Sequence, residues 1–465
     1  MAKDKLNTQA PLKIAFIHPD LGIGGAERLV VDAAVGLQER GHQVVMYTSH
    51  HDKNHCFEET RDGTLEVRVE GNSIIPRTIF GRFYILCAIL RQFHLCISLL
   101  RQQKDTYDVL FVDQLSACIP LLKLFCSSKV FFYCHFPDKK LARHDTLIQR
   151  IYRAPVDLFE EYTTGMADTV VVNSNFTAGV FKRSFPSILK NPRTLYPPIN
   201  LEAYDKEVDI DDPRVKVLIS DRKLIVSINR FERKKAIDLA IHSFAMLKED
   251  GGIRPEIFNS MRLIVGGGYD PRVAENVEYH KELNKLAQET YKLKTFTLMP
   301  GSTEVVPTDS QVVFLCSFND SQRGYLLSHA TVVLYTPSNE HFGITPVEAM
   351  YARAPVIAAN NGGPVETVKH NVTGLLLPPT PENWRDGIKS IATAELDGRK
   401  MGEAGRKHAQ ERFSLEAFVD QLEDILDELV SGGRPTKHYY DNVEYGVRIA
   451  IAIVVFGLYV NYWWL

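Results

Sequence analysis

Two glutamates and two basic residues in the second half of the chain have the types and spacing needed to bind a sugar nucleotide. Glu340 and Glu348 are separated by seven residues in the segment NEHFGITPVEAM. A carboxylate accepts hydrogen bonds from vicinal hydroxyl groups, so one glutamate could hold a donor hexose and the other a nucleotide ribose. Arg230 and Lys235 could neutralise the diphosphate between the two sugars. These four residues predict a site for a nucleoside diphosphate sugar.

The segment around the glutamates predicts a strand, a polar loop and a helix start. The preceding run is β-branched and aromatic, which is typical of a buried strand. Gly343 lets the backbone approach a ligand closely, and Thr345 is the expected N-cap with Pro346 in the first helical position. The N–H groups around Gly343, Ile344 and Thr345 would then face a diphosphate. The alternative is a capping box of Thr345 and Glu348 that serves only the helix.

Arg230 and Lys235 lie in a predicted connection between a strand at 224–228 and an amphipathic helix. Glycine turns at 266–268 and 360–366 also follow predicted strands. The carboxyl ends of parallel strands meet at one edge of a sheet, so we expect the cations, these turns and the glutamates to share that edge. A solvated run of charges is the alternative for the two cations.

A glycine turn in the first half, with Gly24 and Gly25, follows a predicted strand at 13–17. Its pattern is GxGG rather than GxGxxG, and no acidic residue follows the next strand, so a dinucleotide-dependent dehydrogenase is disfavoured. The turn could face a phosphate or a sugar across a cleft. A purely structural tight turn is the alternative.

His135 is a further candidate in the first half. It follows a predicted strand at 130–133 in the segment CHFPD. The crevice beyond the carboxyl ends of parallel strands is where such sheets bind ligands. His135 could donate a hydrogen bond to a sugar hydroxyl or a phosphate there, and a structural histidine is the alternative.

Length and strand pattern predict an α/β protein. At 465 residues the chain is too long for one ordinary core, and strands alternate with helices in both halves. We expect Rossmann-like domains at 1–196 and 223–430, joined by a linker at 197–222. The net charge of −3 argues against broad nucleic-acid binding. The seven cysteines show no CxxC and no clustering with histidine, so reduced thiols and no metal site are expected.

Two apolar segments indicate contact with a membrane. Residues 83–100 could form a helix at the lipid interface, and a packing helix of the first domain is the alternative. Residues 449–465 are apolar with aromatic residues at the end, and basic residues lie in the juxtamembrane segment 431–448. This pattern predicts a transmembrane tail anchor with the catalytic domains in the cytosol. The short span suits the thin endoplasmic reticulum membrane.

Four motifs together resemble the retaining GT-B glycosyltransferases of family four. They are GGAE near the N-terminus, RxxxxK, the glutamate pair, and GGPxE. The segments HPDLGIGGAERLV, CHFPD and YTPSNEHFGI are similar to the members of that family that extend dolichol-linked oligosaccharides. The resemblance covers roughly residues 12–430. It implies a GT-B fold, in which two Rossmann-like domains face a central cleft.

The resemblance also implies an activity. The donor would be GDP-mannose, and the acceptor would be mannosyl-chitobiosyl diphosphodolichol on the cytosolic face of the endoplasmic reticulum. Mannose would be added with alpha-1,3 and alpha-1,6 linkages, in an order left open, as an early part of N-glycan precursor synthesis. No metal and no cofactor besides the donor are expected. Other mannosyltransferases of the pathway are expected partners.

The family pattern gives roles to the candidate residues. The two cations would hold the diphosphate, Glu340 the donor mannose and Glu348 the ribose. Gly24 or Gly25 would approach the phosphate from the other domain, and His135 would lie near the reacting sugar. Two alternative functions stay open: transfer of N-acetylglucosamine to phosphatidylinositol, and a catalytically silent scaffold for other transferases.

Overall fold

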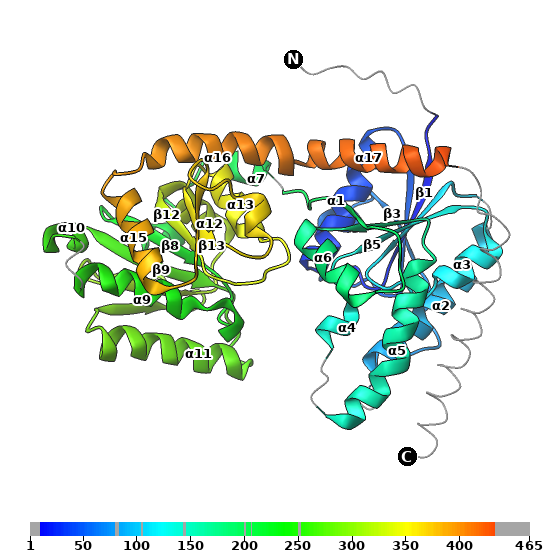
Figure 1. The fold of residues 1–465 in the computed structure, drawn as a ribbon, viewed down its shortest axis with the longest axis horizontal. Coiled ribbons are helices and arrows are strands. Elements are labelled where there is room, and N and C mark those ends of the chain that lie inside the picture. The colour runs from blue at the N-terminus through cyan, green and yellow to red at the C-terminus, as the bar shows by residue number, and fades with distance from the viewer. Residues whose placement is uncertain are drawn as a thin grey trace. The chain divides into compact units, whose positions relative to one another are not determined.

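The elements of the chain form two compact units, each built on a parallel sheet (Figure 1). The computed structural model describes residues 10–79, 83–103, 106–142, 146–199, 201–205, 207–249 and 253–432. The first unit holds the chain up to Pro198 and again from Leu415, and the second unit is Ile199–Ser414.

The first unit has a seven-stranded parallel sheet with the order β3-β2-β1-β4-β5-β6-β7. Its strands are β1 Lys13–His18, β2 Gln43–Thr48, β3 Glu66–Val69, β4 Val109–Asp113, β5 Lys129–Cys134, β6 Thr169–Val172 and β7 Arg193–Thr194. Its α-helices are α1 Gly25–Glu39, α2 Tyr84–Gln103, α3 Ile119–Phe125, α4 Asp138–Leu141, α5 Leu147–Gly165, α6 Asn175–Ser184 and α17 Leu415–Ser431.

The second unit has another seven-stranded parallel sheet, with the order β10-β11-β9-β8-β12-β13-β14. Its strands are β8 Lys223–Ile228, β9 Met261–Gly267, β10 Thr295–Leu298, β11 Val312–Cys316, β12 Ala330–Tyr335, β13 Val356–Ala359 and β14 Gly374–Leu377. Its α-helices are α7 Glu202–Asp205, α8 Pro213–Lys216, α9 Ile237–Glu249, α10 Pro255–Asn259, α11 Ala274–Lys285, α12 Asp320–His329, α13 Ile344–Tyr351, α14 Pro364–Thr367, α15 Pro381–Ala392 and α16 Gly398–Phe413.

The central strands are buried along almost their whole length because helices cover both faces of each sheet. In the first unit, Phe111 stacks between Phe16 and Phe131 with ring centroids 4.4 Å apart on each side. Helices therefore cover the faces of each sheet, whereas the carboxyl ends of the strands remain uncovered by them and can carry the side chains of a site.

The strand orders locate where ligands are expected. In a doubly wound sheet, the crevice opens where neighbouring strands send their connections in opposite directions. That point lies between β1 and β4 in the first unit and between β8 and β12 in the second. The parallel pairing of the strands confirms the two predicted α/β units. The predicted candidates follow the strands at these points or their neighbours.

The division of the chain differs from the prediction near the C-terminus. The predicted second domain runs to residue 430, whereas α17 belongs to the first unit. Apolar side chains of α17 pack on α1, and Val419 lies so close to Gly36 that a side chain at position 36 would clash with it. In the predicted linker 197–222, residues from Ile199 onward belong to the second unit, including α7 and α8.

The predicted helix at 83–100 is present as α2, and one side of it packs into the hydrophobic core of the first unit. Leu95, Cys96 and Leu99 are buried there. By length and composition alone α2 could cross a membrane. Within its apolar stretch of 18 residues, 39% is buried inside the protein. The predicted tail anchor at 449–465, and the juxtamembrane segment beyond residue 432, lie outside the described residues.

Candidate functional site

Lys235 and Glu340 meet in the second unit, although 105 positions separate them in the chain. Lys235 Nζ lies 2.6 Å from Glu340 Oε1, and the side chains are only 11% and 25% exposed. Lys235 ends a 3₁₀ helix after β8, and its carbonyl accepts a hydrogen bond from Thr336 Oγ1 after β12. The connections of two neighbouring strands are thus tied together, and a cation and a carboxylate share one place at the sheet edge.

The helix after Glu340 begins earlier than predicted. Gly343, and not Thr345, is the N-cap of α13, with φ +87°, and Ile344 is the first helical residue. The prediction of Thr345 as N-cap in a capping box with Glu348 is therefore wrong. A glycine fits this left-handed conformation, and Pro346 is tolerated as the third helical residue because the first N–H groups of a helix have no intrahelical partner. Within the described residues no side chain caps α13.

A second glycine loop supports the chain around Glu340. Gly363 N donates to the carbonyl of Glu340 at 2.7 Å, and a side chain on Gly362 or Gly363 would collide with the backbone of the loop. Asn339 N donates to Asn361 Oδ1 at 2.7 Å. The predicted turn at 360–366 therefore positions the glutamate loop.

Glu348 is buried in α13 and forms an ion pair with Arg323 of α12. Burial would lower the pKa of Arg323, but the negative charge of Glu348 and a neighbouring tyrosine raise it. That tyrosine is Tyr204: burial and the charge of Glu348 raise its pKa. Neither Arg323 nor Tyr204 was predicted from the sequence, because each lies in a segment with no motif of its own.

Arg230 lies at the end of β8 and is 65% exposed, with a contact of 3.3 Å to Glu232. Its aliphatic stem runs over Gly268, after β9, where an added Cβ would lie 3.1 Å from Arg230 Cγ. A side chain on Gly267 would clash with the carbonyl of Asn229. The glycines at 267 and 268 therefore leave room for the chain that carries the exposed guanidinium.

Ala236 separates Lys235 from α9 and has φ +46° and ψ +45°. This left-handed conformation costs an L-residue roughly 1–2 kcal/mol. The chain turns sharply here between Lys235 and α9. Glycine adopts this conformation without that cost, so it would be favoured over alanine at position 236.

The candidates of the first unit also lie at the carboxyl edge of their sheet. Gly24 is the N-cap of α1 and has an extended backbone that any residue adopts, and an added Cβ there would meet the carboxylate of Glu27. An added Cβ on Gly25 meets nothing within 4 Å. His135 Nε2 lies 2.8 Å from Asp113 Oδ1 at the end of β4.

Asp113 also bonds to a second histidine. His18 Nδ1 lies 2.8 Å from Asp113 Oδ2, so the buried carboxylate links β1, β4 and the segment after β5. Burial alone would lower the pKa of His18, but hydrogen bonds and charges from Asp113 and Glu27 raise it to about 9. Burial would raise the pKa of Asp113, but His135 and His18 hold it below its usual value. The orientation of His135 is thereby fixed by a charged, buried partner.

The structure therefore places seven predicted residues at the carboxyl edge of the second sheet and three at that of the first, and it joins Lys235 to Glu340. The first group is Arg230, Lys235, Glu340, Gly343, Ile344, Thr345 and Glu348; the second group is Gly24, Gly25 and His135. A cleft that joins the two groups stays a prediction. Among the described residues there is no group of three His, Cys, Asp or Glu side chains that could hold a metal ion.

Two families match the two halves of the chain. Residues 23–203 match the family described as Glycosyltransferase Family 4, and residues 209–408 match the family described as Glycosyl transferases group 1. A Rhizomucor pusillus protein named alpha-1,3/1,6-mannosyltransferase ALG2 is 61% identical over 91% of this chain and 93% of its own length. The chain belongs to the ALG2 family of mannosyltransferases.

Other ALG2 relatives have lower sequence identity and also align over most of both chains. The human protein of that name is 44% identical over 90% of this chain and 96% of its own length. The Saccharomyces cerevisiae protein is 44% identical over 94% of this chain and 88% of its own length. Membership in the ALG2 family confirms the predicted mannosyltransferase activity and favours it over transfer of N-acetylglucosamine to phosphatidylinositol.

Solved structures support the fold of this ALG2 family member. Sucrose-phosphate synthase from Thermosynechococcus elongatus matches with a TM-score of 0.67 and 20% identity, over 91% of this chain and all of that chain. The glycosyltransferase WaaG matches with a TM-score of 0.60 and 16% identity, over 90% of this chain and all of that chain. At such identities the match concerns the fold alone, which is GT-B.

Proposed function

We propose that the chain transfers mannose from GDP-mannose to mannosyl-chitobiosyl diphosphodolichol and forms alpha-1,3 and alpha-1,6 linkages. The names of its relatives support this reaction class. The observation that carries the proposal is the contact between Lys235 and Glu340 beside the start of α13. There a cation, a carboxylate and the N–H groups of a helix start lie at one sheet edge.

This arrangement suits the departure of a diphosphate. Negative charge grows on the leaving group as the sugar is released, and fixed cations and helix dipoles lower the free energy of that state. Lys235 and Arg230 would supply the cations, and α13 the dipole. We include in the proposal that these groups act without a metal or another cofactor.

The two glutamates would hold the two sugars of the donor. Glu340 is paired with Lys235 in the free protein, so binding would exchange this contact for hydroxyl groups of mannose and leave Lys235 to the diphosphate. Glu348 would accept from the ribose hydroxyls while Arg323 holds its carboxylate in place. His135, fixed by Asp113, would lie near the reacting sugar.

Melting temperatures of the purified full-length protein test the donor assignment. GDP at a hundred times its Kd should stabilise the protein by about 2.7 kcal/mol, whereas UDP at the same concentration should have little effect. Lys235→Met should weaken GDP binding about tenfold or more, because a charge-assisted contact to the diphosphate is lost. Lys234→Met is the matched control, because Lys234 is exposed and pairs with Glu232 instead.

Two results would contradict the donor assignment. One is equal stabilisation by GDP and UDP, and the other is an equal effect of the two lysine variants. Transfer of labelled mannose from GDP-mannose to the lipid-linked acceptor then tests the reaction. Growth restored in a deficient cell by Glu340→Ala would favour the scaffold alternative.

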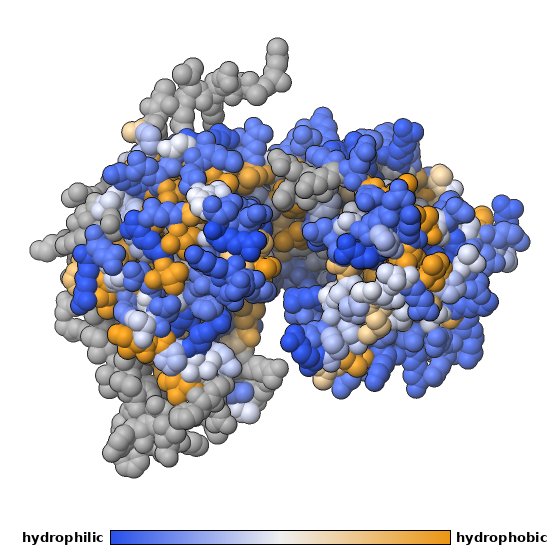
Figure 2. Space-filling model, turned by 180° about the vertical axis from the view of Figure 1, so that it is seen from behind, coloured by the Kyte–Doolittle hydropathy of each residue, from blue (hydrophilic) through white to orange (hydrophobic). Residues whose placement is uncertain are grey.

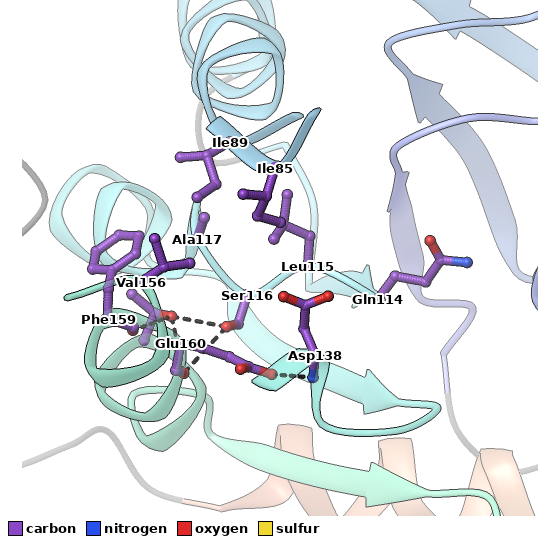
Figure 3. A pocket seen from close by; sticks show the side chains of 11 residues that line it. Ile85, Ile89, Gln114, Leu115, Ser116, Ala117, Asp138, Val156, Phe159 and Glu160 are labelled. Carbon is purple, nitrogen blue, oxygen red and sulfur yellow. Dashed lines mark hydrogen bonds between the residues drawn. The ribbon is translucent and has the colours of Figure 1, made fainter. Parts of the chain in front are cut away.

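We further propose that the protein works at the endoplasmic reticulum membrane, with both units in the cytosol. Leu147, Ile151 and Leu158 of α5 are exposed and lie on one helix face at spacings typical of an interfacial helix. Side chains of α2 and α5 line one pocket, so these helices are neighbours (Figure 3). Hydrophobic side chains also form groups among hydrophilic ones on the face in Figure 2. The predicted tail anchor would add a second point of attachment.

A further inference from the structure

A pocket of about 430 Å³ in the first unit is lined by none of the residues assigned above. Its walls come from the segments that follow β1 and β2, from the loop before α2, and from α2 itself. It therefore opens at the carboxyl edge of the sheet, where parallel α/β sheets bind ligands. A pocket of this size could hold a small polar headgroup.

Arg91 of α2 is buried in the wall of this pocket without a carboxylate partner among the described residues. It is only 8% exposed. Its Nη2 donates to the carbonyl of Ser49 at 2.7 Å, whereas its Nε is buried and has no hydrogen-bond partner in the described part of the chain. Burial and the positive charge of Arg77 lower the pKa of Arg91. A buried guanidinium is costly unless an anion compensates it, so this one points to a bound anion.

Arg77 supplies a second cation at the mouth of the pocket. It is 62% exposed, pairs with Asp20, and lies 3.4 Å from His50 Nε2. An exposed ion pair contributes little to stability. A bound anion could therefore replace Asp20 as the partner of Arg77 at a small cost in free energy. Two guanidinium groups, one buried and one exposed, match the charge of a diphosphate and can each bind several of its oxygens.

Part of the remaining wall is apolar surface of α2. Tyr84 and Ala88 line the pocket together with Arg91, and their spacing puts all three on one face of α2. The same helix is apolar enough in composition to cross a membrane. An anion bound at Arg91 would therefore be adjacent to apolar surface along α2, which is the arrangement that a phosphorylated lipid requires.

We propose that this pocket binds the diphosphate of the lipid-linked acceptor, with Arg91 and Arg77 holding the phosphate oxygens and α2 beside the first isoprene units. The inference rests on the proposed function and adds to it the site of the acceptor headgroup. The ligand chemistry is an organic diphosphate, which a free nucleotide or pyrophosphate could also offer.

Steady-state kinetics of the full-length protein in detergent test this assignment. The acceptor is offered as a phytanyl diphosphate oligosaccharide and as its monophosphate analogue, at saturating GDP-mannose. Arg91→Gln and Arg77→Gln should each raise the KM for the diphosphate acceptor about tenfold or more, with the KM for GDP-mannose unchanged. Both variants should lose much of the preference for the diphosphate over the monophosphate analogue, which a merely structural change would not affect.

Two further variants sharpen the test. Arg101→Gln is the matched control, because Arg101 is an exposed arginine of α2 that does not line the pocket, and its kinetics should equal those of the wild type. Asp20→Asn should lower the KM for the diphosphate acceptor, because it frees Arg77 and removes a like charge. If Arg91→Gln does not fold, as shown by loss of part of the cooperative thermal transition and of the helical circular dichroism signal, Arg77→Gln carries the test because its side chain is exposed.

The outcomes separate this proposal from the proposed function. No mannosyl transfer by folded wild-type protein would contradict the function itself. Normal transfer with unchanged acceptor KM in both arginine variants would overturn only the present assignment. Inorganic pyrophosphate that protects the wild type from heat but not Arg91→Gln, together with unchanged acceptor kinetics, would assign the pocket to a free anion and overturn the lipid assignment.

Discussion

Single residues of the site differ in how far the sequence reveals them. Spacing alone indicated Lys235 and Glu340, and the structure confirms that they are in contact. Partners such as Arg323 and Asp113 were missed because their function depends on a contact with a residue distant in the chain. No local pattern marks an arginine that will meet Glu348 from another helix, or an aspartate that will bond to two histidines.

His18, one of the two histidines that bond to Asp113, gives the stability of the protein a defined pH dependence. The pKa of His18 is raised from 6.5 to about 9, so the folded state favours its protonated form. This stabilisation is complete below pH 6.5 and is lost as the pH rises through 9. We expect the free energy of unfolding of the first unit to fall over that range by up to about 3 kcal/mol.

Thermal melts of wild type and His18→Gln between pH 6 and 9.5 would check this expectation. The variant should show a flatter dependence of melting temperature on pH. His55→Gln is the matched control, because His55 is an exposed histidine of the same unit, and it should keep the wild-type slope. Equal slopes for wild type and His18→Gln would disprove the role of His18.

At the scale of elements, the strands that the sequence analysis missed are the four sheet edges, β3, β7, β10 and β14. The edge strands β3 and β10 are short and partly exposed, so they lack the continuous apolar run that marks a central strand, whereas β14 is apolar but only four residues long. The start of α13 was misplaced for a related reason. Thr345 satisfies the usual N-cap rule, but the positive φ of Gly343, which a sequence does not display, lets the helix begin earlier.

The packing of α17 on α1 provides a prediction at this scale. Gly36→Val should destabilise the first unit by about 1–3 kcal/mol, because the new side chain would overlap Val419. Combining it with Val419→Ala should restore about 0.5–3 kcal/mol relative to the sum of the single effects. Denaturant melts of the four proteins in this cycle give the measurement.

Gly25→Val is the matched control for stability, because Gly25 lies in the same helix and an added Cβ there meets nothing within 4 Å. Its effect should not depend on residue 419. Strictly additive effects of the changes at 36 and 419 would show that the two helices do not pack as described.

For the whole molecule, the pattern of strands and helices predicted two α/β units, and family resemblance predicted the GT-B fold. The boundary near 430 could not be predicted, because an amphipathic helix shows that it covers a sheet but not which sheet. The family matches also end before α17, at residue 408.

The second unit should fold as an isolated fragment. Residues 199–414 are one continuous stretch with their own sheet and core. We expect this fragment to unfold cooperatively on heating and to be stabilised by GDP, because Arg230, Lys235, Glu340 and Glu348 all belong to it. Circular dichroism melts with and without GDP measure both. A fragment without a cooperative transition would contradict the division into units.

The return of α17 to the first unit has a consequence for synthesis on the ribosome. The first sheet emerges early, but the helix that covers Gly36 is translated only after the whole second unit, about two hundred residues later. At ordinary elongation rates this delay is on the order of ten to forty seconds. During that time the nascent chain shows an uncovered apolar face, which chaperones that bind such faces can occupy. The late half of the protein is therefore expected to reach its native state before the early half does.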